Sequence, residues 1–167
     1  RPWLVVAPRA IVPESPRGFS WHAQPRGQWP ELPAFDPAVE ALLRFLAAMP
    51  RLYNADPDRT VLMGFSQGAA VAYATALRRP AVARGIAGLV GFVPRVAPEA
   101  VAGRLAGLPV FMAAGEHDET VPPEESRRAA AVLRAAGAAL DYREYPTGHK
   151  MTTAALDDLQ TWLATFP

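Results

Sequence analysis

The sequence predicts an α/β protein with a mostly parallel sheet and helices on both faces. Short apolar segments alternate with longer segments of helical period, and strands that alternate with helices form parallel sheets. Proline or glycine separates most of these segments. With 167 residues, half of them hydrophobic, the chain can bury a sizeable core. We expect a single domain over residues 1–167, with about five strands.

The N-terminal part predicts one strand and a long loop. Trp3–Ala7 is an apolar run that ends at Pro8, which indicates a strand buried on both faces. Residues 8–35 are rich in Pro, Arg and Gly, and a loop of this length inside a compact domain is usually functional or disordered. Its tryptophans favour an ordered loop.

Asp36 and Pro37 predict the start of a helix, as a capping carboxylate followed by proline at the first helical position. An apolar stripe of period 3.6 continues this helix until Pro50. The later elements follow from the same patterns: strands over 59–63, 85–92, 108–114 and 140–145, and helices over 67–78, 122–136 (with Gly137 as C-cap) and 152–166.

The segment Gly64–Gly68, Gly-Phe-Ser-Gln-Gly, lies between a predicted strand and a predicted helix. In that context Gly-x-Ser-x-Gly is typical of a nucleophile elbow, a strained turn whose flanking residues must be small. Such a turn lifts the Ser66 hydroxyl above the sheet. It also directs the backbone N–H of Gln67 toward the same space, at a helix N-terminus. A serine in an ordinary strand-to-helix turn is the alternative.

A serine nucleophile needs a base within hydrogen-bond reach, and the base needs a carboxylate that fixes its tautomer. His149 follows a strand and a glycine, so its turn can present the ring. His117 lies beside the candidate acids and is expected to be a neighbour of the site. His22 lies in the long loop, where an exposed polar side chain is the simpler interpretation.

Three acidic residues follow the strand over 108–114, namely Glu116, Asp118 and Glu119. Asp118 is favoured because it lies just ahead of the point where the loop turns back into a helix. A helix-capping or solvated carboxylate is the alternative for this residue. The chain order Ser, Asp, His is the order that α/β-hydrolases use.

Composition excludes several other classes. The net charge of +1 offers no electrostatic basis for binding nucleic acid or an anionic membrane. The chain has no cysteine, no histidine pair at metal-ligand spacing and no Gly-rich phosphate loop, so we expect no metal and no cofactor, and a nucleotide-binding domain is disfavoured. No apolar run is long enough for a membrane span and no signal peptide is visible, so we expect a cytoplasmic protein.

These motifs resemble the phospholipase/carboxylesterase branch of the α/β-hydrolases, which includes acyl-protein thioesterases. The matching pieces are residues 6–10, 18–21, 64–68, 115–122 and 142–149. The resemblance implies that Ser66 is the nucleophile, Asp118 the orienting acid and His149 the general base. It also implies that the Gln67 N–H lies in the oxyanion hole and Trp21 beside the acyl pocket. Trp21 and Phe19 have two possible roles: they form a wall of the binding site, or they only anchor the loop to the body of the domain.

One departure from the family concerns the N-terminus. In the family, a central strand that ends in a His-Gly-type turn precedes the piece matched by Trp3–Ala7 and supplies a second oxyanion donor. This chain begins after it. The chain is then a fragment, or Trp3–Ala7 pairs directly with residues 59–63, or another chain fills the place, for example in a homo-oligomer through this strand edge. A missing oxyanion donor lowers the rate by about 10²–10³.

We therefore expect a serine hydrolase that cleaves small carboxylic esters of short or medium acyl chain through an acyl-enzyme. Two alternatives stay open. The same triad serves thioesterases and small-peptide or lactone hydrolases, because function resides in the pocket and not in the fold. The absent oxyanion segment also fits a non-catalytic or truncated hydrolase-like domain.

Overall fold

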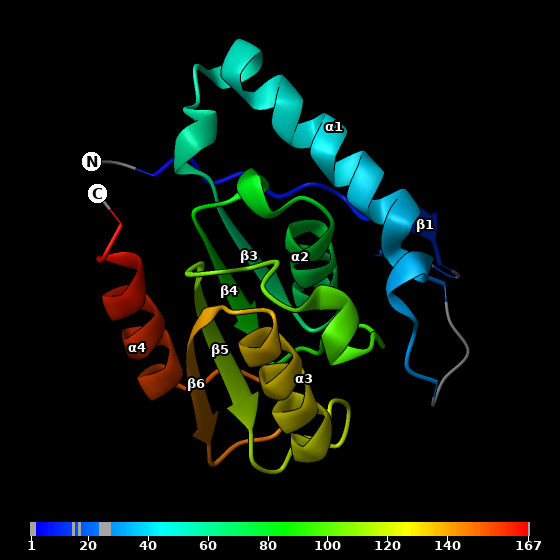
Figure 1. Cartoon of the computed structure of the whole chain (residues 1–167), viewed down its shortest axis with the longest axis vertical. Coiled ribbons are helices and arrows are strands. Elements are labelled where there is room, and N and C mark those ends of the chain that lie inside the picture. Colours follow the sequence, from blue (N-terminus) through cyan, green and yellow to red (C-terminus); the bar gives the residue numbers. More distant parts are fainter. Residues whose placement is uncertain (1–2, 15, 17, 24–27, 167) are drawn as a thin grey trace.

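The computed structural model describes residues 3–14, 16, 18–23 and 28–166. Within this part, the central element is a parallel sheet of four strands, in the order β3-β4-β5-β6 (Figure 1). All neighbouring strands are parallel, which confirms the predicted α/β class. The strands are β3 (Val61–Phe65), β4 (Gly85–Leu89), β5 (Pro109–Gly115) and β6 (Ala139–Tyr145).

Helices cover both faces of this sheet. In Figure 1, α4 lies on one side of the sheet, and α2 and α3 lie on the other. The α-helices are α1 (Asp36–Tyr53), α2 (Gln67–Arg78), α3 (Pro123–Ala135) and α4 (Thr153–Leu163). Short 3-10 helices are η1 (Leu32–Phe35), η2 (Pro57–Arg59), η3 (Pro80–Val82) and η4 (Pro98–Val101).

The two faces of the sheet build two apolar clusters, because successive side chains of a strand point to opposite faces. Ile86 and Val110 belong to the larger cluster, which also contains the buried sides of α2 and α3. Ala87 and Phe111, the next residues along these strands, belong to the cluster with α4. Burial on both faces explains why β4 and β5 are continuous apolar runs in the sequence.

The predicted strand over Trp3–Ala7 is wrong. The segment has no strand partner among the described residues, and Val5 is 79% exposed. The direct pairing with residues 59–63, one of the three possibilities for this segment, is not formed, because β3 pairs with β4 and its other edge is open in the described part of the chain. A groove of about 1470 Å³, lined by residues of both segments, lies there instead. An apolar composition therefore did not suffice to predict a strand here, although the edge of β3 is open among the described residues.

Self-association through this open edge stays a prediction. Met63 and Phe65 on β3 are 55% and 44% exposed, and unpaired apolar strand edges recruit partners. The molar mass in solution, measured over a range of protein concentrations, would test it.

The loop over 8–35 carries a small amount of regular structure. β1 (Val12–Pro13) and β2 (Phe19–Ser20) form a two-residue antiparallel pair, and η1 leads into α1. Farther along, Leu32 is tied to the body, because its N–H donates to the carbonyl of Arg95 at 2.9 Å. The described part of this loop is therefore ordered, as its tryptophans indicate.

The helix after this loop begins at Asp36 as predicted, but its predicted cap and its predicted C-terminal end are wrong. Asp36 is not the N-cap, because η1 runs directly into α1 and Phe35 takes that position. Pro50 does not end the helix, which continues to Tyr53. Proline disrupts a helix by removing one N–H and crowding the preceding turn, and here only one further turn follows. Asn54 ends the helix with a left-handed conformation (φ 53°), and its N–H donates to the Pro50 carbonyl.

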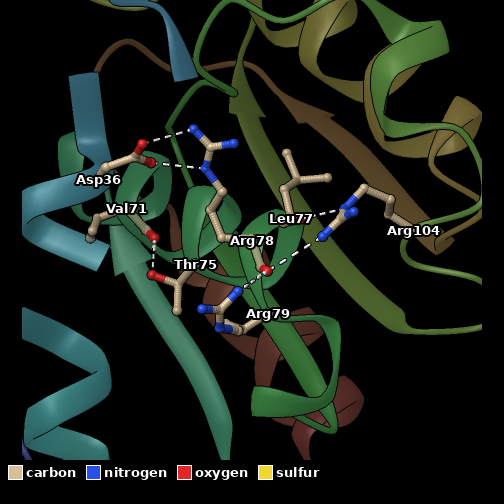
Figure 2. A network of polar contacts seen from close by, with 7 residues as sticks. All are labelled: Asp36, Val71, Thr75, Leu77, Arg78, Arg79 and Arg104. Atoms are coloured by element: carbon tan, nitrogen blue, oxygen red, sulfur yellow. Dashed lines mark hydrogen bonds and ion pairs between the residues drawn. The ribbon is translucent and has the colours of Figure 1, made fainter. Parts of the chain in front are cut away.

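Asp36 instead forms an ion pair at the far end of α2 (Figure 2). The Arg78 guanidinium donates to both carboxylate oxygens, at 2.8 and 3.0 Å. Arg104 donates to the carbonyls of Leu77 and Arg78, at 2.6 and 3.3 Å. Cations at a helix C-terminus interact favourably with the helix dipole. The two arginines therefore stabilise the C-terminal end of α2, opposite to Ser66.

β6 is an edge strand, as its alternating sequence predicts, and it is bound to a helix on each face. Arg127 of α3 donates to both carboxylate oxygens of Glu144, and this contact, with the Tyr142 hydroxyl, holds the Glu144 pKa below its usual range. On the other face, the Tyr145 hydroxyl and Arg143 contact Asp158 of α4 and lower its pKa. These contacts position the end of β6, from which the His149 loop starts.

Candidate active site

Ser66 lies on a strained turn between β3 and α2. Its φ and ψ are 53° and −119°, a conformation that non-glycine residues adopt only where the surroundings enforce it. Gly64 allows the turn, because a Cβ there would lie 2.2 Å from the carbonyl carbon and oxygen of Gly68. A Cβ on Gly68 would meet no atom within 4 Å. The close approach therefore requires glycine at 64 and not at 68.

We expect Gly64→Ala to destabilise the fold by about 3 kcal/mol, the upper range for overpacking, because the clash is with backbone atoms that cannot rotate away. Thermal unfolding followed by circular dichroism measures this loss. Gly68→Ala is the matched control and should unfold within a few degrees of the wild type. Equal stability of the two variants would contradict this description of the turn.

Three loops at the carboxyl ends of β3, β5 and β6 meet at one point. Nε2 of His149 lies 3.0 Å from the Ser66 hydroxyl oxygen, and Nδ1 lies 2.8 Å from Oδ2 of Asp118. Each distance is within hydrogen-bond range. The imidazole thus bridges the hydroxyl and the carboxylate, although the three residues are separated by up to 83 positions in the chain.

Asp118 is distinguished from its acidic neighbours by burial and by its partners. Its side chain is fully buried, whereas Glu116 and Glu119 are exposed. Oδ1 accepts hydrogen bonds from the backbone N–H groups of Thr120 and Val121, both at 2.8 Å. These two donors satisfy one oxygen and orient the other toward His149. The loop turn that favoured Asp118 from the sequence supplies these donors.

The Asp118 and His149 loops are joined by backbone contacts. The N–H of Glu116 donates to the Tyr145 carbonyl at 2.8 Å, and the N–H of His117 donates to the Thr147 carbonyl at 2.9 Å. A Cβ on Gly115 would lie 2.5 Å from the carbonyl oxygen of Gly148, so the loops approach as closely as glycine allows. His117, an exposed residue next to Asp118, thereby contributes through its backbone.

Phe65 is a neighbour of the site that sequence reasoning missed. Its ring packs edge-on against the His149 ring, with centroids 5.1 Å apart. The aromatic ring limits the orientations open to the imidazole. The variable second position of the Gly-x-Ser-x-Gly motif gave no signal for this contact, because it depends on how two distant loops meet.

Trp21 and Phe19 occupy different environments. Trp21 is partly buried against the larger apolar cluster, and its backbone N–H donates to Oε1 of the Gln67 side chain at 2.6 Å. Phe19 is 45% exposed, and the Arg9 guanidinium lies 4.2 Å from its ring centroid. His22 is not the exposed side chain expected from the sequence, because its ring is half-buried and stacks on Phe35 at 5.4 Å. Of the two candidate wall residues, Trp21 is the one bound to the elbow.

Gln67 is the first residue of α2, so its N–H is one of the donors that a helix leaves free at its N-terminus. Such a donor beside Ser66 can stabilise negative charge. Across the described residues, no group of three or more His, Asp or Glu side chains is arranged to hold a metal ion. The helices in the described part of the chain are too short or too polar to cross a membrane.

The parallel sheet and the strained turn after β3 place the protein among the α/β-hydrolases, and its structural neighbours agree. The carboxylesterase from Mesorhizobium loti superposes with a TM-score of 0.81 at 25% identity, covering 93% of this chain and 73% of that one. Esterase PE8 superposes with a TM-score of 0.76 at 28% identity, covering 97% and 78%. The Bacillus cereus carboxylesterase, at 23% identity and a TM-score of 0.83, shares the fold over 95% of this chain and 74% of its own.

The family model described as Phospholipase/Carboxylesterase matches residues 11–166, and the chain belongs to this family. Acyl-protein thioesterase 1 of Gibberella zeae is 34% identical over 115 residues, which are 64% of this chain and 48% of the relative. A probable carboxylesterase, SOBER1-like, of Arabidopsis thaliana is 29% identical over 111 residues, 65% of this chain and 42% of the relative. The chain thus matches about half the length of these curated relatives or less.

Proposed function

We propose that residues 1–167 form a single domain that hydrolyses small carboxylic esters through a Ser66–His149–Asp118 triad. The observation that carries this proposal is the bridging imidazole, 3.0 Å from the Ser66 hydroxyl and 2.8 Å from Asp118. A nucleophile, a base and an orienting acid within hydrogen-bond reach are the signature of nucleophilic catalysis by serine. Membership of the phospholipase/carboxylesterase family supports the same class of reaction.

In the proposed mechanism, Nε2 of His149 takes the Ser66 proton as the hydroxyl oxygen attacks the ester carbonyl. The Gln67 N–H stabilises the resulting oxyanion. His149 then gives the proton to the departing alcohol, which leaves an acyl group on Ser66. Water, activated by the same imidazole, hydrolyses this acyl-enzyme and restores the serine. Asp118 holds Nδ1 in its protonated tautomer and stabilises the imidazolium in both steps.

A thioesterase is the second candidate, because the relative from Gibberella zeae is named acyl-protein thioesterase 1. The same triad cleaves either bond, so the substrate decides between the two. For this chain, an apolar acyl group is favoured by the aromatic residues beside the elbow, Phe65 and Trp21.

A matched substrate panel tests the proposed function. The purified protein is assayed on p-nitrophenyl acetate and butyrate, on the corresponding thioesters, and on a small-peptide anilide. We expect ester turnover above the buffer rate and little or no cleavage of the anilide. Faster cleavage of the thioester at equal acyl chain would favour the second candidate. No turnover of any acyl substrate would overturn the assignment and favour a non-catalytic domain.

A further inference from the structure

The Gln67 side chain makes two hydrogen bonds that the catalytic scheme does not use. Its Oε1 accepts from the N–H of Trp21 at 2.6 Å, and its Nε2 donates to the carbonyl of His22 at 2.9 Å. The partners lie 46 and 45 positions away in the chain. One planar amide thus binds the backbone of two successive residues of the N-terminal loop.

This pairing requires an amide, because the site offers one donor and one acceptor. A carboxylate would lose the bond to the His22 carbonyl, and an apolar side chain would lose both. Gln67 directly follows Ser66 on the strained turn, so the amide links the segment of Trp21 and His22 to the nucleophile itself. A shift of that segment relative to Ser66 must break or stretch these bonds.

Among the described residues the segment has other contacts as well, and the Trp21 side chain packs against the larger apolar cluster. On one side, Phe19 and Ser20 pair with Val12 and Pro13 in a ladder of only two residues, too short to fix a loop by itself. On the other side, the His22 ring stacks on the buried Phe35. The Gln67 amide is the contact by which the segment is hydrogen-bonded to the elbow.

We propose that Gln67 is a positioning residue whose side chain holds Trp21 as a wall of the acyl site, at a fixed distance from Ser66. We call the two hydrogen bonds of the Gln67 amide the clamp. The expected kinetic effect rests on the proposed ester hydrolysis, whereas the clamp itself does not. Substrates whose acyl group reaches the wall depend on these hydrogen bonds, whereas an acetyl group is too short to reach it.

Hydrogen exchange of the Trp21 amide tests the clamp without any substrate. We expect Gln67→Met to raise this exchange rate by about ten-fold, because the N–H loses its acceptor. Gln67→Glu keeps an acceptor oxygen for this N–H and loses only the donor to His22, so the Trp21 amide should stay closer to the wild type. Gln160→Met, the same change on an exposed position of α4, should leave the rate unchanged.

Kinetics on p-nitrophenyl acetate and p-nitrophenyl octanoate test the role of the clamp. Gln67→Met should raise KM for the octanoate by about ten-fold or more, and kcat/KM should fall further for the octanoate than for the acetate, because only the longer acyl group reaches Trp21. If the role of Gln67 were purely structural, the variant would lose kcat/KM equally on both substrates. Gln67→Glu should show an intermediate KM for the octanoate, and it replaces the methionine variant in both assays if the latter does not fold.

Two results would overturn the proposal. One is wild-type exchange of the Trp21 amide in Gln67→Met, and the other is an equal loss on acetate and octanoate. Failure of the proposed function looks different, because the wild-type protein would then hydrolyse neither ester and would not react with the phosphonate, while the exchange of the Trp21 amide would still report on the clamp.

Discussion

Replacing Ser66 with alanine is expected to lower kcat for an activated ester by up to about 10⁶-fold. The change removes only the hydroxyl oxygen that lies 3.0 Å from Nε2 of His149. Without it no acyl-enzyme forms, and what remains is catalysis by the oxyanion donor and by binding. Initial rates on p-nitrophenyl acetate, over a range of substrate concentrations, measure the effect.

The control for this variant is Thr161→Ala, which removes a hydroxyl from an exposed position of α4. Its activity should stay within about two-fold of the wild type. Ser66→Ala should also unfold at a temperature close to the wild type, because the alanine keeps the same backbone conformation. Residual hydrolysis at the wild-type rate in Ser66→Ala would assign the reaction to another group.

Replacing Asp118 with asparagine is expected to lower kcat by about 10⁴-fold while the fold is kept. The backbone N–H groups of Thr120 and Val121 both donate to Oδ1, so the amide oxygen of the asparagine must take that place. The amide NH₂ then faces Nδ1 of His149 as a donor. The imidazole is forced to carry its proton on Nε2, and that nitrogen can no longer accept the proton of Ser66.

Glu119→Gln is the matched control for this prediction, since it makes the same chemical change at the exposed neighbouring acid. It should keep its kcat within about two-fold of the wild type. A comparable loss in both variants would mean that the loop's overall charge, and not the hydrogen bond from Asp118 to His149, supports catalysis. A wild-type kcat in Asp118→Asn would remove this residue from the mechanism.

The elements around the candidate site were predictable because their determinants are local. α2 begins and ends where the sequence predicts, since the elbow motif starts it and Pro80 follows it. Gly137 ends α3 with a φ of 84°, a conformation that favours glycine. Ser66 and His149 each follow a predicted strand, and parallel strands bring their carboxyl ends to one edge of the sheet.

The errors of sequence reasoning concern contacts between distant segments. Trp3–Ala7 has the composition of a buried strand, but it does not pair with the open edge of β3 or with any other described strand. Asp36 has the position of a helix cap, but Arg78 at the end of another helix binds its carboxylate. The clamp of Gln67 on Trp21 was also missed, because the motif predicts where its N–H points and says nothing of its side chain.

We propose that Ser66 is an activated nucleophile. Reaction with a fluorophosphonate, followed by intact mass and peptide mapping, tests it most directly, because the reagent needs an activated serine but no particular leaving alcohol or acyl chain. We expect a single adduct on the peptide that contains Ser66, none in Ser66→Ala, and much slower labelling in Asp118→Asn. An unmodified wild-type protein, or an adduct on any other residue, would contradict it.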